Sequence, residues 1–131
     1  MEVELIVDTN RKISLSSFEK QLDGSCCAVI DIVSSKLSYS EKEFYFEDFP
    51  QFIENLEFMY SKLKGSAELR FHHESDYIKF EAQSLGHIEV TGEFLEYGEI
   101  QQNIYFGFVF DQSYLPSFIA SLKAVSASLY S

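Results

Sequence analysis

The strongest constraint on the fold is a period-two alternation of apolar and polar residues in the second half of the chain. It recurs in four segments, at residues 67–71, 77–82, 87–94 and 104–110. In the last of them Phe106 and Phe108 share one parity, and Tyr105 has the other. Strand side chains alternate between the two faces of a sheet, so each segment predicts a strand with one buried face. This pattern is typical of an antiparallel sheet covered on one side.

The first half of the chain predicts four more strands. They span residues 2–7, 12–18, 26–33 and 37–46. In the last segment the apolar parity changes, because Leu37 and Tyr39 share one parity while Phe44 and Phe46 have the other. A bulge or a bend accounts for such a change.

Two segments carry apolar residues at helical spacing, at about 49–64 and 114–130. Each has a proline that suits the first turn of a helix, preceded by a residue that suits an N-cap. These residues are Asp48 with Pro50, and Ser113 with Pro116. Gly65 is predicted to end the first helix.

We therefore predict an α+β fold in a single domain over residues 1–131. Its largely antiparallel sheet has about 6–8 strands, and both amphipathic helices pack on one face. A shift of 66 residues aligns the two helices, so each half reads as four strands followed by a helix; this describes architecture and is not evidence of duplication. The apolar face is expected to bury Ile78, Phe80, Ile88, Val90, Phe106 and Phe108.

Charge narrows the classes of partner. The formal net charge of −11 argues against nucleic acid and against anionic membrane surfaces, which both require clustered Lys or Arg. It permits a basic protein partner, although solubility alone also explains it. The N-terminus is unlike a signal peptide, and no apolar stretch approaches the roughly 20 residues that span a bilayer, so a cytoplasmic protein is expected.

No catalytic or phosphate-binding motif occurs, so no enzymatic activity and no cofactor are predicted. Cys26 and Cys27 are adjacent, and adjacent strand side chains point to opposite faces. A disulfide between them would be strained, and buried free thiols are predicted instead.

The best candidate for a metal site is the run from His72 to Asp76, which reads His-His-Glu-Ser-Asp. Adjacent histidines of one strand face opposite sides and do not share an ion easily. His72 with His87 across neighbouring strands is the alternative pair. Positions at a solvated strand end account for both groups of residues without a bound ion, so no metal site is predicted.

The distribution of charge gives the candidate binding residues. No Lys or Arg occurs between Phe80 and Leu122, whereas acidic residues recur there with tyrosines among them. Such a surface suits a basic protein, because Tyr supplies contact area and carboxylates steer encounter. An ordinary solvated face is the alternative. The candidates are Tyr77, Glu81, Glu89, Glu93, Glu96, Tyr97, Glu99 and Tyr105.

Three stretches resemble a known family. Phe46 to Leu56 resembles its junction between strand and first helix, while Leu85 to Val90 and Phe108 to Leu115 resemble its closing strands and final helix. The family is the WapI-type immunity proteins with related uncharacterised small acidic bacterial proteins, and the similarity covers roughly residues 44–131. The resemblance implies an α+β fold and neutralisation of a toxin domain by direct binding. Many such toxins are nucleases with basic clefts, which suits an acidic partner.

Three hypotheses for function follow. The first is a protein-binding domain, such as an immunity protein that neutralises a basic toxin domain. The second is a small-ligand-binding or enzymatic domain with a cavity between sheet and helices. The third is a structural protein that self-associates through exposed strand edges. The partner and the oligomeric state are not predicted.

Overall fold

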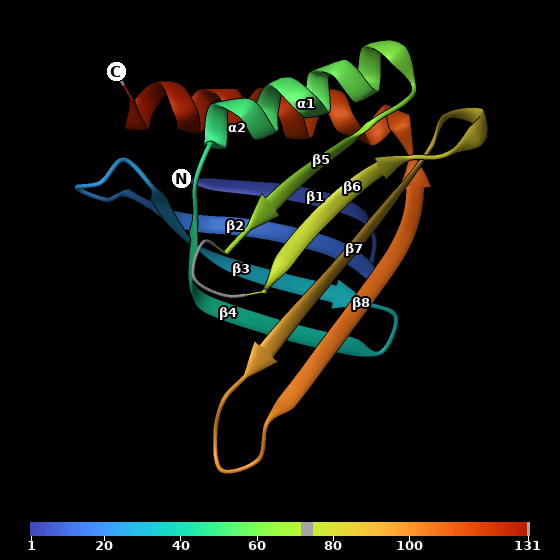
Figure 1. Cartoon of the computed structure of the whole chain (residues 1–131). Helices are drawn as coiled ribbons and strands as arrows, with labels where there is room; N and C mark the ends of the chain where they lie inside the picture. Colours follow the sequence, from blue (N-terminus) through green and yellow to red (C-terminus); the bar gives the residue numbers. More distant parts are fainter. Residues whose placement is uncertain (72–74, 131) are drawn as a thin grey trace.

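The computed structural model describes residues 1–71 and 75–130 of the chain (Figure 1). These residues form eight strands and two α-helices. The elements of the first half are β1 (Glu2–Asp8), β2 (Arg11–Lys20), β3 (Cys26–Ser34), β4 (Leu37–Phe46) and α1 (Phe49–Lys62). Those of the second half are β5 (Ser66–Arg70), β6 (Tyr77–Ala82), β7 (His87–Glu96), β8 (Gln102–Asp111) and α2 (Leu115–Leu129).

The strands form two antiparallel sheets, each with its strands in sequence order. We call β1 to β4 the first sheet and β5 to β8 the second sheet. The α+β fold predicted from sequence is confirmed, and each half consists of four strands followed by a helix. The alternation pattern did not predict the division into two sheets, because every strand that buries one face has the same pattern whichever sheet it joins.

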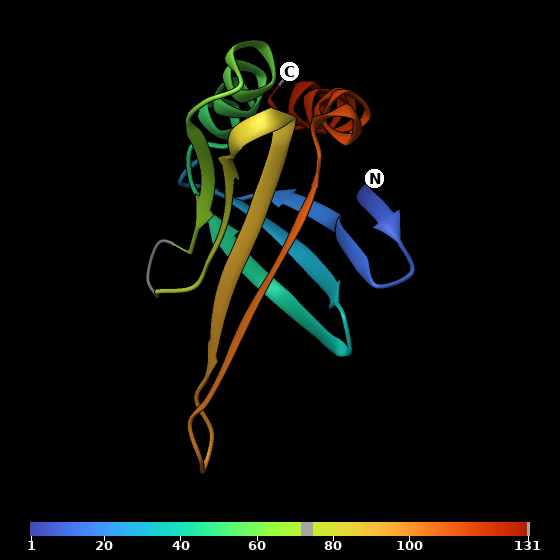
Figure 2. The ribbon, with the colours of Figure 1, turned by 90° about the vertical axis from the view of Figure 1, so that its right-hand side faces the viewer.

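The two helices lie side by side across one end of the sheets (Figure 2). Apart from their contact with each other, the helices pack mainly against the first strand of the other half: α1 against β5, and α2 against β1. This reciprocal arrangement couples the two halves into one apolar core.

Phe80 of β6 shows that both helices cover the same face of the second sheet, as predicted. Its ring contacts Phe52 of α1 and Phe118 of α2, with centroids 6.0 and 5.7 Å away. The first sheet covers the rest of this face, where Phe94 packs against Phe44 at 5.9 Å. All six residues expected in the core are buried: Ile78, Phe80, Ile88, Val90, Phe106 and Phe108.

The change of parity in β4 is a β-bulge. Ala28 of β3 pairs with Phe44, but Ile30 pairs with Glu41, so β4 has one extra residue between these pairs. The extra residue rotates the later part of the strand, which brings Phe44 and Phe46 into the core.

The predicted helix caps are confirmed only in part. Asp48 holds the N-cap position of α1, but its backbone is left-handed, with φ 55°, and its side chain makes no capping hydrogen bond, because an N-cap side chain reaches the first turn from an extended backbone. Ser113 is not the cap of α2. The Asp111 carboxylate accepts the Ser113 N–H at 2.9 Å and so caps the 3₁₀ turn that precedes α2. The first helix ends at Lys62, before Gly65.

We predict that Phe80→Ala lowers the free energy of unfolding by about 3–5 kcal/mol, because it leaves a cavity where both helices meet the second sheet. Urea denaturation followed by circular dichroism measures the change. The control is Phe58→Ala on α1, whose ring is 48% exposed and whose loss is expected to cost under about 1 kcal/mol. Equal losses in the two variants would contradict the central place of Phe80.

Candidate protein-binding surface

One row of side chains crosses the outer face of the second sheet. The strand register places Arg70 opposite Tyr77, Tyr77 opposite Glu93, and Glu93 opposite Tyr105. The row faces outward because residues of the opposite parity, such as Ile78 and Phe106, are buried in the core. Folding thus brings together three of the candidate residues, Tyr77, Glu93 and Tyr105, from three strands.

A second group of candidates lies farther along the same face. Glu81 of β6 pairs directly with Glu89 of β7, which pairs in turn with Val109 of β8. We call Tyr77, Glu81, Glu89, Glu93 and Tyr105 together the Tyr–Glu face.

Two cationic side chains, Arg70 and Lys79, lie on this surface, although residues 80–122 contain no Lys or Arg. The Arg70 guanidinium forms an ion pair with Glu68 at 2.7 Å and lies over the Tyr77 ring, 5.4 Å from its centroid. The Lys79 ammonium lies 3.8 Å from the Glu81 carboxylate. Both residues precede the stretch 80–122 in sequence but lie beside it in the sheet. Among the described residues, Glu89, Glu93 and Glu96 of β7 form no ion pair with either cation.

Tyr77 has an environment that fits a contact residue. Its pKa is raised, first by burial and then by the neighbouring Tyr105 and Glu93. The phenol therefore stays neutral and can donate a hydrogen bond over the whole physiological pH range. Tyr105 is more open, with 61% of its surface exposed.

The remaining candidates lie at the tip of the β7–β8 hairpin. Glu96 ends β7, and Tyr97 and Glu99 lie in the turn; all three are exposed. Both views show this hairpin projecting beyond the rest of the molecule (Figures 1 and 2). The tip is thus separate from the row of Tyr77, although β7 connects the two.

Sequence reasoning missed two exposed apolar residues of the same hairpin. Ile100 is 77% exposed in the turn, and Val109 is 44% exposed on the outer face of β8. The alternation of β8 contained the signal for Val109, because its parity is that of the outward residue Tyr105. Ile100 lies outside any alternating segment, so no periodicity marks it.

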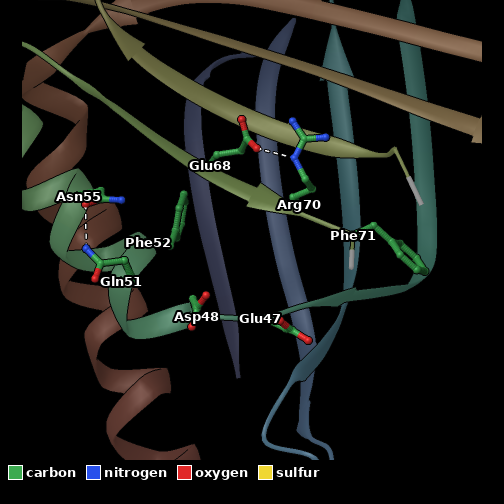
Figure 3. Close-up of a pocket in the computed structure, with 8 residues that line it drawn as sticks. All are labelled: Glu47, Asp48, Gln51, Phe52, Asn55, Glu68, Arg70 and Phe71. Carbon is green, nitrogen blue, oxygen red and sulfur yellow. Dashed lines mark hydrogen bonds and ion pairs between the residues drawn. The ribbon is translucent and has the colours of Figure 1, made fainter. Parts of the chain in front are cut away.

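A cleft of about 430 Å³ opens between the start of α1 and β5, beside the Tyr–Glu face (Figure 3). Arg70 lines the cleft and also contacts the Tyr–Glu face through the Tyr77 ring. Within the cleft the Gln51 side-chain amide donates to Asn55 at 3.0 Å, and Arg70 pairs with Glu68. The described lining is Glu47, Asp48, Gln51, Phe52, Asn55, Glu68, Arg70 and Phe71.

This cleft is the part of the structure that best fits the second hypothesis, a ligand site between sheet and helices. Its described lining contains no Cys, His, Ser or Thr, so it presents no nucleophile paired with an imidazole base. Its three carboxylates and single guanidinium suit the binding of a polar or cationic group.

The metal candidate lies largely outside the described residues, which omit His72, His73 and Glu74. Among residues 1–71 and 75–130, no three His, Cys, Asp or Glu side chains come close enough to hold an ion. Asp76 is buried, and its carboxylate accepts the Leu95 N–H at 3.1 Å. It therefore has a structural role, as a link between the start of β6 and β7.

Residues 8–129 match the sequence model of the immunity protein WapI-like family. The chain belongs to this family. The match includes all of β2, β3 and β4, so the relationship reaches well beyond the residues 44–131 in which the sequence resemblance was seen. No curated protein and no solved structure matches the chain significantly.

The family membership indicates an immunity function for the WapI-like chain, exerted on a toxin protein. In the described part of the chain, no helix is both long enough and apolar enough to cross a membrane.

The two cysteines of this WapI-like protein are free and buried, as predicted. Cys26 is completely inaccessible to solvent. Burial, with a smaller contribution from Cys27, raises the pKa of the Cys26 thiol to about 11. The pKa of Cys27 is raised as well, again mainly by burial. Because the thiolate is the nucleophile, both effects suppress reactivity.

We predict that iodoacetamide at pH 8 modifies Cys26 at least roughly 100-fold more slowly in the native protein than in urea, because burial limits both access and ionisation. Mass spectrometry of the Cys26–Cys27 peptide measures the rate. The native rate should rise with pH and keep rising above pH 9, because a raised pKa delays formation of the thiolate. Rapid native alkylation with a plateau near pH 8 would instead indicate a reactive thiol.

Proposed function

We propose that this protein neutralises a basic toxin domain by binding it directly, through the Tyr–Glu face and the tip of the β7–β8 hairpin. Membership of the immunity family supports the general function. The observation that carries the choice of surface is the row in which Glu93 lies between Tyr77 and Tyr105 on neighbouring strands.

This row combines the two features of a protein-binding surface. The tyrosines supply large, rigid contact area with a polar tip, which is typical of interface hot spots. Among the described residues, Glu89, Glu96 and Glu99 form no ion pair, so their charge is available to attract a cationic partner. Neutralisation then follows from occupation of the toxin surface and needs no catalysis by this chain.

We predict that reversing Glu89, Glu93 and Glu96 together to Lys slows association with the toxin domain about tenfold or more at low salt, because these carboxylates accelerate encounter. The probe is a catalytically inactive form of the toxin domain encoded by the neighbouring reading frame. Stopped-flow or surface plasmon resonance measurements at low and moderate salt give the rate, which should also lose most of its salt dependence.

The matched control reverses Glu2, Glu4 and Asp31, which changes the net charge by the same amount on the outer face of the first sheet. There Glu4 and Asp31 both pair with Ser14 of β2. This control should retain most of the association rate. Equal effects of the two triple variants would show that net charge matters and that the Tyr–Glu face is not the interface.

We further predict that Tyr105→Ala raises the dissociation rate and weakens binding by about 2 kcal/mol, as expected for a hot-spot tyrosine. Tyr60→Ala on α1 is the control, because Tyr60 is also well exposed, at 44%, but lies on a helix outside the proposed surface. Unchanged dissociation in Tyr105→Ala would remove this residue from the interface.

A further inference from the structure

Strand β8 forms one edge of the second sheet, and only part of that edge is covered. In an antiparallel pair, alternate residues direct both backbone groups toward the partner strand or away from it. Two contacts from the first sheet show which residues point away. The Val109 carbonyl accepts from the Arg11 guanidinium at 2.6 Å, and the Gly107 carbonyl accepts from the Ser34 hydroxyl at 3.1 Å.

The same parity places the backbone groups of Asn103 and Tyr105 on the outer side of β8. The register with β7 runs without a shift from His87 to Glu96, so the alternation is unbroken. Among residues 1–71 and 75–130, no group pairs with the N–H or C=O of Asn103 or Tyr105. Since both residues are exposed, four backbone hydrogen-bonding groups face water in a regular strand.

The other sheet edges are protected in ways that β8 is not. In the second sheet β5 lies against α1, and in the first sheet β1 lies against α2. The backbone groups of Ser38 and Ser40 in β4 point away from β3. However, Lys36 and Lys42 flank this stretch, and the β-bulge ends it. Bulges and lysines are common devices that prevent strand addition at an edge. The open part of β8 has neither device.

We propose that a basic β-strand of the toxin partner adds to β8 at Asn103 and Tyr105 and extends the second sheet. This inference rests on the proposed function and specifies how the partner is held. Backbone hydrogen bonds hold an added strand, while side chains beside it select its sequence. Glu93, Glu96 and Glu99 favour Lys or Arg in that strand, and Ile100 contacts apolar residues near the tip.

Charge also decides between a toxin strand and a second copy of this chain. Two β8 edges paired with each other would bring two acidic hairpins together, from chains that each carry a net charge of −11. Like charges across an interface are unfavourable, so a cationic strand is the better occupant.

We predict that Asn103→Pro weakens binding of the inactive toxin domain about tenfold or more, measured by isothermal titration calorimetry. Proline removes an N–H that points away from β7, so the ladder within the hairpin keeps its bonds; edge strands tolerate proline at such positions. Asn103→Ala removes only the side chain, which donates to Glu93 at 3.3 Å, so the further loss of affinity in Asn103→Pro relative to Asn103→Ala measures the backbone N–H. Ser40→Pro is the matched control on the β4 edge and should bind normally.

Amide exchange of the wild-type protein, measured by nuclear magnetic resonance, gives a second readout that needs no variant. The amides of Asn103 and Tyr105 should exchange rapidly in the free protein and become protected in the complex. The amides of Ile104 and Phe106, which point toward β7, should be protected in both states. Docking through side chains alone would leave the first two amides rapidly exchanging.

The outcomes separate this inference from the proposed function. If Asn103→Pro binds normally and the two amides stay unprotected, strand addition is wrong; a loss of binding in the triple variant of Glu89, Glu93 and Glu96 then still supports the acidic surface. If all these variants bind normally, both proposals fail. If the wild-type chain sediments as a dimer that Asn103→Pro dissociates, the occupant is a second copy, which also overturns the inference. If Asn103→Pro fails to fold, protection of the wild-type amides decides.

Discussion

The reciprocal packing of the helices is the interaction on which the rest of the structure depends. Because α1 lies against β5 and α2 lies against β1, each half covers apolar strands of the other as well as its own. The aromatic side chains of both halves meet as a result, with Phe80 between the two helices and Phe94 against the first sheet. Aromatic rings bury a large area each, which allows a core without disulfides or metal in a chain of this length.

This core also determines the character of the outer surface. Every second residue of β6, β7 and β8 points inward, so the polar residues between them form continuous rows on the outside. Gly92 shows how tightly the two faces are coupled. A Cβ at this position would lie 2.2 Å from the Phe106 ring and 2.9 Å from the Tyr77 carbonyl oxygen. The backbone beneath Tyr77 and Glu93 is thus held directly against the core, which makes this part of the outer face rigid.

Much of the fold could be predicted from the sequence, because alternation and helical spacing report local burial. Both helices, the strands and the bulge in β4 followed from these patterns alone. The capping hydrogen bonds did not, because Asp48 holds the N-cap position with a left-handed backbone from which its side chain makes no bond to the first turn. Long-range contacts decide how the strands divide between two sheets and which strand each helix packs against. Such contacts produce no periodic pattern in the sequence. For the same reason, the glutamates of β7 identified its outer face from the sequence, whereas only the pairing of the strands shows that Arg70 of β5 and Lys79 of β6 lie on the same face of the sheet.

The packing of α2 against β1 has a consequence for the order in which the protein is made. The apolar side of β1 is synthesised before β2 to β8, yet the helix that packs against it follows all eight strands. Until α2 emerges, the nascent first sheet lacks one of its covers and exposes residues destined for the core. The native surface therefore exists only after the whole sequence up to α2 has been translated, and a chain shortened within that helix loses its β1 contacts as well as its own.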